Sequence, residues 1–478
     1  GVSDRRAELF SWEALAHGEM GSPLWDLAQT SLLRHGELHN NLRMTWGKQL
    51  LQWTPSPEAA RAMLVDLNHR YALDGRDPCS YGGLYWCLGL FDRPFTPTSP
   101  VLGTVRGRSV ETHTSRLSMP RLRARILRPA FGSSLRVAVV GAGIAGLSCS
   151  RALVNHGIHV EVFEKSGGPS GRANTQNFPE DELEFDHGAP YFTARDPLFR
   201  RHVESWVEQG LAAPWEVATQ QLSGDGRQVG PARPTMRPRY VGFPRMSAVG
   251  KHLARGLTLH VRCPIAAVNE TGEQRWHLVE ESGRVHGPFD RVVVAVPATQ
   301  APPLVRARPN LEALASSAQY VASETLMMRF DHALHVSWDA ATVQGGSLVW
   351  VARESSKPGR ADSNTWIAQS SSAFAAQYLA SDRPTVEREL LAALSRLTGS
   401  DLQPRWVRAH RWSLARPGVV ARSDSPRAIL DRGLGLCGDW LMGPRVEAAW
   451  LSGRALAGQL LAQMPRPGEP TSAQLSLL

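Results

Sequence analysis

The chain has 478 residues, 42% of them hydrophobic, and a formal net charge of +9, which is enough material for sizeable cores in more than one domain. Its five cysteines form no CxxC pair and no His/Cys ligand cluster along the sequence, so we expect neither a disulfide framework nor a metal site. No apolar run reaches the roughly eighteen residues that a spanning helix needs and no signal peptide opens the chain, which predicts a cytoplasmic protein without a membrane partner.

Short motifs in the first quarter of the chain carry a first resemblance. They are GELHNNLRMTWGK at 36–48, LNHRYALDGRDP at 67–78 and YGGLYW at 81–86. Together they resemble the C-terminal part of class II DNA photolyases, which implies that residues 1–120 form an all-α fragment of a FAD-binding domain. The resemblance assigns flavin contacts to Asp74, Arg76 and Asp77. The portions that precede this part in photolyases do not occur in the sequence. We therefore expect DNA to bind only through this fragment, and light-driven repair only in a longer parent protein.

An arginine-rich stretch follows the photolyase-like fragment. Its last part, residues 121–134, is interpreted as a basic linker. The arginines of this region are either a DNA-facing remnant or part of a solvated linker. Lysine occurs only at positions 48, 165, 251 and 357, so arginine supplies almost all of the positive charge. The net charge alone therefore does not establish nucleic-acid binding.

A nucleotide-binding unit is predicted from residue 135 onward. An apolar run typical of a buried parallel strand is followed by G-x-G-x-x-G at Gly141, Gly143 and Gly146. Gly141 permits the tight turn, Gly143 lets the backbone approach a pyrophosphate, and Gly146 lets the next helix pack closely on its strand. A second strand ends at Glu164, which is placed to bind a ribose. This order of elements predicts dinucleotide binding.

A second glycine turn and several later motifs carry another resemblance. They are FEKSGGPSGR at 163–172, FDHGAPYFT at 185–193, and CGDW with GPRVEAAWLSG between 437 and 453. Over about residues 135–464 the chain resembles the renalase branch of the FAD-dependent amine oxidase superfamily. The resemblance implies FAD as the cofactor and assigns cofactor contacts to Gly171, Arg172, Gly438, Asp439, Arg445 and Val446.

The fold class implied is α/β, with a Rossmann-type FAD-binding domain and a mixed α+β substrate domain, as in amine oxidases, after the all-α photolyase-like fragment. The FAD domain is expected to gather 135–193, 240–298 and 433–464, and the substrate domain 194–239 and 299–432. Strands are predicted at 325–330 and 347–352. A helix from about Arg445 would aim its positive end at the flavin. Residues 465–478 are predicted to be a disordered tail.

The substrate side has aromatic and histidine candidates but no assigned catalytic residue. The candidates are Tyr191, Trp350, His410 and Trp412. The chain departs from the family pattern in two places. ANTQN follows Arg172 where the family usually carries arginines, and Pro190 stands where the family usually has an amide. Both departures leave the substrate open.

The function expected from the resemblance is hydride transfer from a reduced nicotinamide, including isomeric NAD(P)H, to FAD and then to molecular oxygen with release of H2O2. Amine oxidation is an alternative within the same superfamily. Light-dependent DNA repair in a longer parent protein is another. A non-catalytic flavoprotein that uses its helical unit for docking is a further alternative.

Overall fold

The chain forms two compact units. The computed structural model describes residues 4–131, 135–233, 237–272, 275–361, 363–418 and 427–464. One unit is built mainly from the residues before Leu135, and the other from Arg136–Ala152 and Val160–Gln463. The predicted tail, 465–478, and the end of the predicted linker, 132–134, lie outside the described residues.

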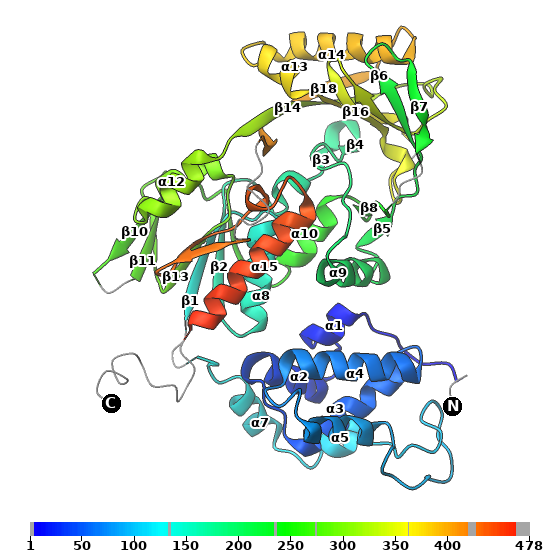
Figure 1. The fold of residues 1–478 in the computed structure, drawn as a ribbon, viewed down its shortest axis with the longest axis vertical. Helices are drawn as coiled ribbons and strands as arrows, with labels where there is room; N and C mark the ends of the chain where they lie inside the picture. Colours follow the sequence, from blue (N-terminus) through cyan, green and yellow to red (C-terminus); the bar gives the residue numbers. More distant parts are fainter. Residues whose placement is uncertain are drawn as a thin grey trace. The chain divides into compact units, whose positions relative to one another are not determined.

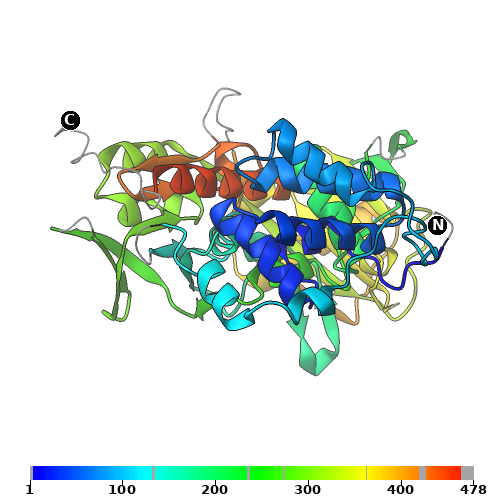
Figure 2. The same ribbon diagram turned by 90° about the horizontal axis from the view of Figure 1, so that it is seen from below.

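The first unit contains helices and loops but no strand within residues 4–131 (Figure 1 and Figure 2). Its helices are α1 (Trp12–His17), α2 (Pro23–His35), α3 (Asn40–Trp53), α4 (Pro57–Tyr71), α5 (Pro78–Cys87), α6 (Val110–Thr114) and α7 (Met119–Ile126). Side-chain caps fix several helix starts, as where Ser56 accepts a hydrogen bond from the Ala59 N–H at 3.2 Å. Trp25 and Trp46 stack in the buried core of this unit. The all-α fragment expected here is confirmed, but α7 continues into residues 121–126, which we interpreted as part of the linker.

A six-stranded sheet lies at the centre of the second unit. In sheet order its strands are β19 (Ile429–Asp431), β20 (Leu434–Leu436), β13 (Arg291–Val294), β1 (Arg136–Val140), β2 (His159–Glu164) and β9 (Thr258–Val261). β13 pairs in parallel with both β1 and β20, and β2 pairs in parallel with β9. β19 adds an antiparallel edge, a common addition to a parallel sheet, although we expected its residues in the substrate domain.

Two helices from distant parts of the sequence pack together beside this sheet (Figure 1). They are α8 (Ile144–Asn155) and α15 (Val446–Gln463). A Cβ atom on Gly453 of α15 would lie 2.0 Å from the carbonyl oxygen of Ala145 in α8. The Ser148 hydroxyl also donates to the Trp450 carbonyl oxygen at 2.7 Å. This close approach holds α15 against α8, the helix that follows the first glycine turn.

A seven-stranded sheet forms the other large layer of this unit. In sheet order its strands are β18 (Trp406–Pro417), β14 (Tyr320–Arg329), β17 (Thr365–Ser370), β16 (Leu348–Arg353), β15 (Ala340–Gln344), β6 (Thr219–Ser223) and β7 (Gln228–Arg233). Helices α13 (Ser372–Gln377) and α14 (Arg383–Thr398) cover its outer face in Figure 1. Leu390 and Leu394 of α14 share a core with Leu326 of β14. Successive strand residues point to opposite faces, so Thr325 points the other way and donates to the His187 carbonyl oxygen at 2.9 Å.

The remaining elements of the second unit are smaller. A three-stranded sheet consists of β10 (Ile265–Thr271), β11 (Arg275–Glu280) and β12 (Val285–Phe289). Two-stranded pairs are formed by β3 (Gln176–Phe178) with β4 (Leu183–Phe185), and by β5 (Ala212–Pro214) with β8 (Tyr240–Gly242). The other α-helices are α9 (Pro197–Glu208), α10 (Ser247–Ala254), α11 (Pro302–Val305) and α12 (Pro309–Ser317).

The α/β fold class expected from the sequence is confirmed, with small shifts in element bounds. β14 starts at Tyr320 instead of residue 325, because Tyr320 already pairs with Pro417 of β18. β16 and α15 each begin one residue later than expected. Among the described residues, the helices are too short or too polar to cross a bilayer.

Candidate functional site

The first glycine turn leaves open space where a ligand's phosphates could approach. Gly141 has a φ of 105°, a conformation that favours glycine. A Cβ atom on Gly146 would lie 2.0 Å from the Gly141 carbonyl oxygen, so the turn tolerates no side chain there. A Cβ atom on Gly143 would meet nothing within 4 Å. The three predicted glycines therefore lie together, and Gly143 faces the free space.

Glu164 lies beside this turn, with an exposed fraction of 7%. Its carboxylate accepts hydrogen bonds from the backbone N–H of Ala142 at 2.7 Å and of Ser166 at 2.8 Å. These bonds hold the acid against the turn and leave some of its acceptor capacity unused. Its role as a ribose ligand stays a prediction.

The second glycine turn packs directly on the first. Ser170 and Gly143 form a β-bridge, and Gly171 has a φ of 55°. A Cβ atom on Gly171 would lie 3.1 Å from the Gly143 Cα. The two turns therefore form one continuous backbone surface.

Arg172 connects the second glycine turn to two residues that are distant in the sequence, Ala415 and Asp439. Its Nη2 donates to the Asp439 carboxylate at 2.6 Å, and its Nη1 donates to the Ala415 carbonyl oxygen at 3.1 Å. Burial acts to lower the pKa of Arg172, but the charge and the hydrogen bond of Asp439, together with Tyr320, outweigh burial and the pKa is raised. The Arg172 guanidinium also lies 5.8 Å from the centre of the Tyr320 ring, and burial raises the pKa of Tyr320 to about 12. The sequence patterns did not indicate Tyr320.

The start of α15 carries a buried acid that the sequence did not single out. Glu447 is 2% exposed and accepts a hydrogen bond from the Asp196 N–H at 2.7 Å. Its other oxygen lies 3.9 Å from Arg445. α15 begins at Val446, so this carboxylate offsets part of the positive end of the helix. Gly438 is held nearby, since its N–H donates to the Ser452 hydroxyl at 2.9 Å.

The four substrate-side candidates fall into two contact groups. His410 and Trp412, both on β18, contact His187, with ring centroids 4.6 Å and 4.9 Å from its ring. Tyr191 and Trp350 form the other group, with ring centroids 5.4 Å apart.

The histidines of the first group are held neutral near pH 7. Burial, with a contribution from His410, lowers the pKa of His187 to about 4. Burial also lowers the pKa of His410. The Nδ1 atom of His187 is buried without a hydrogen-bond partner. The rings of His187, His410 and Trp412 therefore form a cluster of two uncharged imidazoles and one indole, and His187 directly follows Asp186 in the sequence.

The second group contacts a cation that also lines a cleft. The Arg239 guanidinium lies 4.5 Å from the centre of the Tyr191 ring and 5.6 Å from that of Trp350. Arg239 also lines a cleft of about 670 Å³ together with Trp215 and Tyr240. Three carboxylates line the same cleft: Glu204, Glu208 and Glu216. Burial raises the pKa of Glu208.

A buried cluster of ion pairs includes Asp186, the residue that precedes His187. Lys357 lies 3.3 Å from Asp186 and 2.5 Å from Glu354, and Arg360 also pairs with Asp186. Burial acts to raise the pKa of Asp186, but Lys357 and Arg360 hold it at about 2. Lys357 is thus engaged by two carboxylates.

The photolyase-like flavin contacts lie in the helical unit. Asp74 accepts two hydrogen bonds of 2.7 Å from Arg43. Asp77 caps α5 by accepting from the Cys79 N–H at 2.8 Å. Arg76 and Asp77 are exposed. Their flavin contacts stay a prediction.

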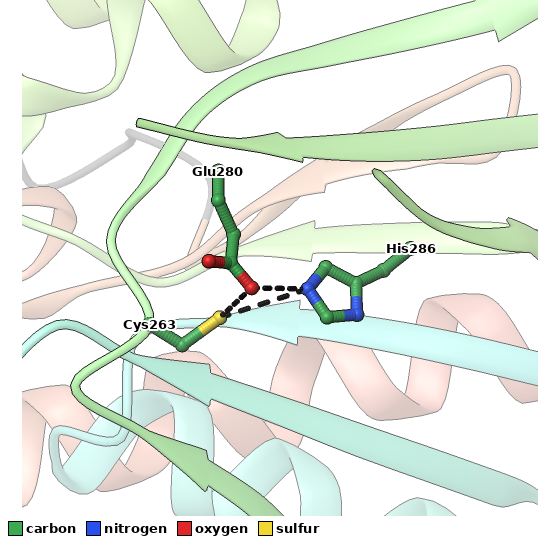
Figure 3. Close-up of side chains that lie close together, drawn as sticks. All are labelled: Cys263, Glu280 and His286. Atoms are coloured by element: carbon green, nitrogen blue, oxygen red, sulfur yellow. Dashed lines mark hydrogen bonds and ion pairs between the residues drawn. The ribbon is translucent and has the colours of Figure 1, made fainter. Parts of the chain in front are cut away.

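One group of side chains corrects the expectation that the cysteines form no His/Cys cluster. Cys263, Glu280 and His286 come together beside β10–β12 (Figure 3). Sequence spacing did not indicate them, because Cys263 and His286 are 23 residues apart and are joined only by strand pairing.

Comparisons with known proteins give two family matches. Residues 217–461 match a family model described as flavin containing amine oxidoreductase. Residues 139–206 match one described as NAD(P)-binding Rossmann-like domain.

The helical unit has relatives of a different kind. Deoxyribodipyrimidine photo-lyases from Oryza sativa subsp. japonica and Arabidopsis thaliana are 37% and 38% identical over 106 residues, which is 22% of this chain and 21% of each relative. The chain thus spans about a fifth of the length of these relatives. A zeta-carotene-forming phytoene desaturase from Myxococcus xanthus is 51% identical over 39 residues, or 8% of each chain.

Solved structures support the fold of the second unit. A protein described as a protoporphyrinogen oxidase from Exiguobacterium sp. 255-15 has a TM-score of 0.56, and a triple mutant of putrescine oxidase has one of 0.53. Each is 14% identical, and the match covers 69% of this chain and 100% of the other. At this identity the likeness concerns the fold alone.

Proposed function

The chain belongs to the flavin containing amine oxidoreductase family, and on this premise we propose that it oxidises a reduced nicotinamide dinucleotide, in particular an isomer of NADH or NADPH. The family makes it an FAD-dependent oxidase. Bound FAD would supply the acceptor for the hydride, and its reoxidation by oxygen, with uptake of protons from solvent, would yield H2O2.

The residues present fit FAD. The open space at Gly143 suits a pyrophosphate, and a side chain at Gly171 would press on that turn. We propose that Gly141, Gly146 and Glu164 complete the adenosine end, and that Gly438, Asp439, Arg445 and Val446 lie at the flavin end. We also propose the division into a FAD domain and a substrate domain along the boundaries expected from the sequence.

The packing of His187, His410 and Trp412 against one another is the observation that carries the choice of donor. A dihydronicotinamide gives up hydride without losing a proton to a strong base. Burial keeps His187 and His410 uncharged near pH 7. They can therefore pack as neutral rings against the flat nicotinamide ring. Trp412 adds an aromatic face, and its Nε1 is held by the His187 carbonyl oxygen at 2.9 Å.

Arg239 supplies a cation for the phosphates of a dinucleotide. A guanidinium binds phosphate oxygens through two parallel hydrogen bonds. Its position over Tyr191 and Trp350 keeps it oriented at the edge of the cleft.

Product analysis under air tests this proposal. A mixture of NADH isomers should yield β-NAD⁺ and H2O2 in equal amounts, and Arg239→Gln should raise KM by about tenfold while kcat changes little. Glu216→Gln, which alters the same cleft without removing the cation, is the control and should not raise KM. A failure of the isomers to form β-NAD⁺ under turnover would refute the proposal.

The acids of the cleft favour a second candidate, oxidation of a cationic amine. Glu204, Glu208 and Glu216 add negative charge to the lining of the cleft, which attracts ammonium groups and repels phosphates. With an amine substrate, Glu208→Gln should weaken turnover and Arg239→Gln should improve it. Arg239→Gln therefore gives opposite results for the two candidates.

Resemblance of the helical unit to photolyases supports a further candidate, light-dependent DNA repair in a longer parent protein. The unit covers only a fifth of those relatives, so the test is repair of a dimer-containing oligonucleotide under blue light. Equal rates of repair by the longer parent protein in blue light and in the dark would count against it.

A further inference from the structure

Three side chains of different chemistry converge beside the three-stranded sheet (Figure 3). Cys263 precedes β10, Glu280 ends β11 and His286 lies in β12. The Cys263 Sγ is 3.1 Å from Glu280 Oε1, which is 2.5 Å from His286 Nε2. Sγ and Nε2 are 3.8 Å apart. A thiol, a carboxylate and an imidazole therefore point at one small volume.

The surrounding sheet holds this arrangement in place. His286 lies opposite Leu278 in the pairing of β12 with β11. The Glu281 N–H bonds to the Pro264 carbonyl oxygen at 3.0 Å, which ties the Cys263 segment to the end of β11. The Ser282 hydroxyl donates to the second oxygen of Glu280 at 2.8 Å. Outer hydrogen bonds of this kind orient the carboxylates that bind metals.

We propose that Cys263, Glu280 and His286 bind a divalent transition-metal ion, with zinc as the best match. Sulfur, nitrogen and oxygen ligands together are typical of zinc, whereas calcium and magnesium take oxygen ligands. Zinc bond lengths of about 2.0–2.3 Å place tetrahedral ligand atoms roughly 3.4–3.6 Å apart. The Sγ–Nε2 separation is close to this already, and the carboxylate oxygen has to move outward by less than about 1 Å. A water molecule takes the fourth position, and binding releases the thiol proton to solvent.

The site is sheltered and still reachable. The side chains of His286 and Glu280 are 11% and 13% exposed, and Cys263 is 7% exposed. The Cys263 N–H bonds to the Glu164 carbonyl oxygen at 2.9 Å. A bound metal therefore steadies the backbone next to the acid at the end of β2.

Zinc binding by the flavin-loaded full chain, with any affinity tag removed, tests the proposal. Calorimetric titration near pH 7 should give one zinc ion per chain, and zinc should raise the unfolding temperature. Cys263→Ser and His286→Gln should each weaken binding more than about tenfold, and Ser282→Ala by about tenfold, as for other outer partners of metal ligands. His277→Gln, in β11 but outside the cluster, is the matched control and should bind as the parent does. Calcium and magnesium should not compete.

Two results would overturn the proposal. One is the absence of stoichiometric zinc binding, and the other is equal affinity in the parent, Cys263→Ser and His286→Gln. Flavin content and unfolding temperature without metal report whether each variant folds. If the serine variant does not fold, the isosteric Glu280→Gln takes its place. Cobalt is a second probe of the site. A thiolate-to-cobalt charge-transfer band should form in the difference spectra of the parent and of His277→Gln. Its absence from both would contradict ligation by Cys263.

Discussion

At the residue scale, the pair of Arg172 and Asp439 organises the candidate site. Both residues were predicted as separate cofactor contacts from their motifs. The structure shows that each is also the other's partner across 267 residues of sequence. Asp439 is 7% exposed, so Arg172 takes the place of much of the water that would otherwise contact its carboxylate.

Replacing Arg172 should therefore destabilise the protein. Arg172→Gln leaves a nearly buried carboxylate without its cation, which costs roughly 1–3 kcal/mol of unfolding free energy. Urea unfolding measures this loss, and flavin content should fall in parallel. Arg405→Gln breaks an exposed ion pair with Asp331 and serves as the control, with an expected change below about 0.5 kcal/mol. Equal losses in the two variants would contradict the role given to Arg172.

His187 should make stability depend on pH. Its folded pKa of about 4 lies below the ordinary value of 6.5, so the unfolded chain takes up a proton first as the pH falls. Its contribution is complete above pH 6.5 and is lost between about 6.5 and 4, by roughly 3 kcal/mol. The pKa of Asp186, about 2, places its own loss below about pH 4. His187→Asn should flatten the upper part of the profile of unfolding temperature against pH. An unchanged profile would show that this imidazole is not the group responsible.

At the scale of elements, the glycine turns were the most predictable part of the site. Each glycine requirement is local, since a turn and a close helix approach are fixed by a few neighbouring residues. The positions of β14 and α15 were also predicted to within a few residues. By contrast, Tyr320, Glu447 and the Cys263 cluster depend on strand register and on helix packing across distant segments. No local pattern encodes those contacts.

The first turn allows a test that separates folding from cofactor binding. Gly143→Ala places a methyl group in open space, so the apoprotein should unfold at nearly the parent's temperature. The same methyl group lies where a pyrophosphate has to approach, so flavin affinity should fall by at least about tenfold. Gly168→Ala also adds a methyl group in open space and is the control. Parent-like flavin content in Gly143→Ala would place the phosphates elsewhere.

At the scale of the whole molecule, the chain joins two units with separate relatives. The helical unit matches about a fifth of the length of its photolyase relatives, whereas the oxidase family match lies in the second unit. The sequence predicted both units from their motifs. The resemblance implied a reduced nicotinamide as the donor, with an amine as the alternative. The residue pattern alone did not choose between them, because Arg239 and the cleft acids, which we propose make this choice, meet only in the folded chain.

Truncation tests the independence of the oxidase unit. A protein that begins at Ser134 should retain FAD in a one-to-one ratio, because the cofactor contacts proposed for the oxidase unit all lie after that residue. Its unfolding temperature should remain within a few degrees of that of the full chain when measured with flavin bound. Loss of flavin on truncation would mean that the helical unit takes part in forming the site.

Anaerobic mixing with reduced nicotinamides tests the central claim most directly, by following the blue absorbance band of the oxidised flavin. The account predicts rapid bleaching by isomerised NADH or NADPH and slow bleaching by pure β-NADH. Bleaching by an amine but not by the isomers would contradict the proposed donor and favour the acidic cleft as the substrate site.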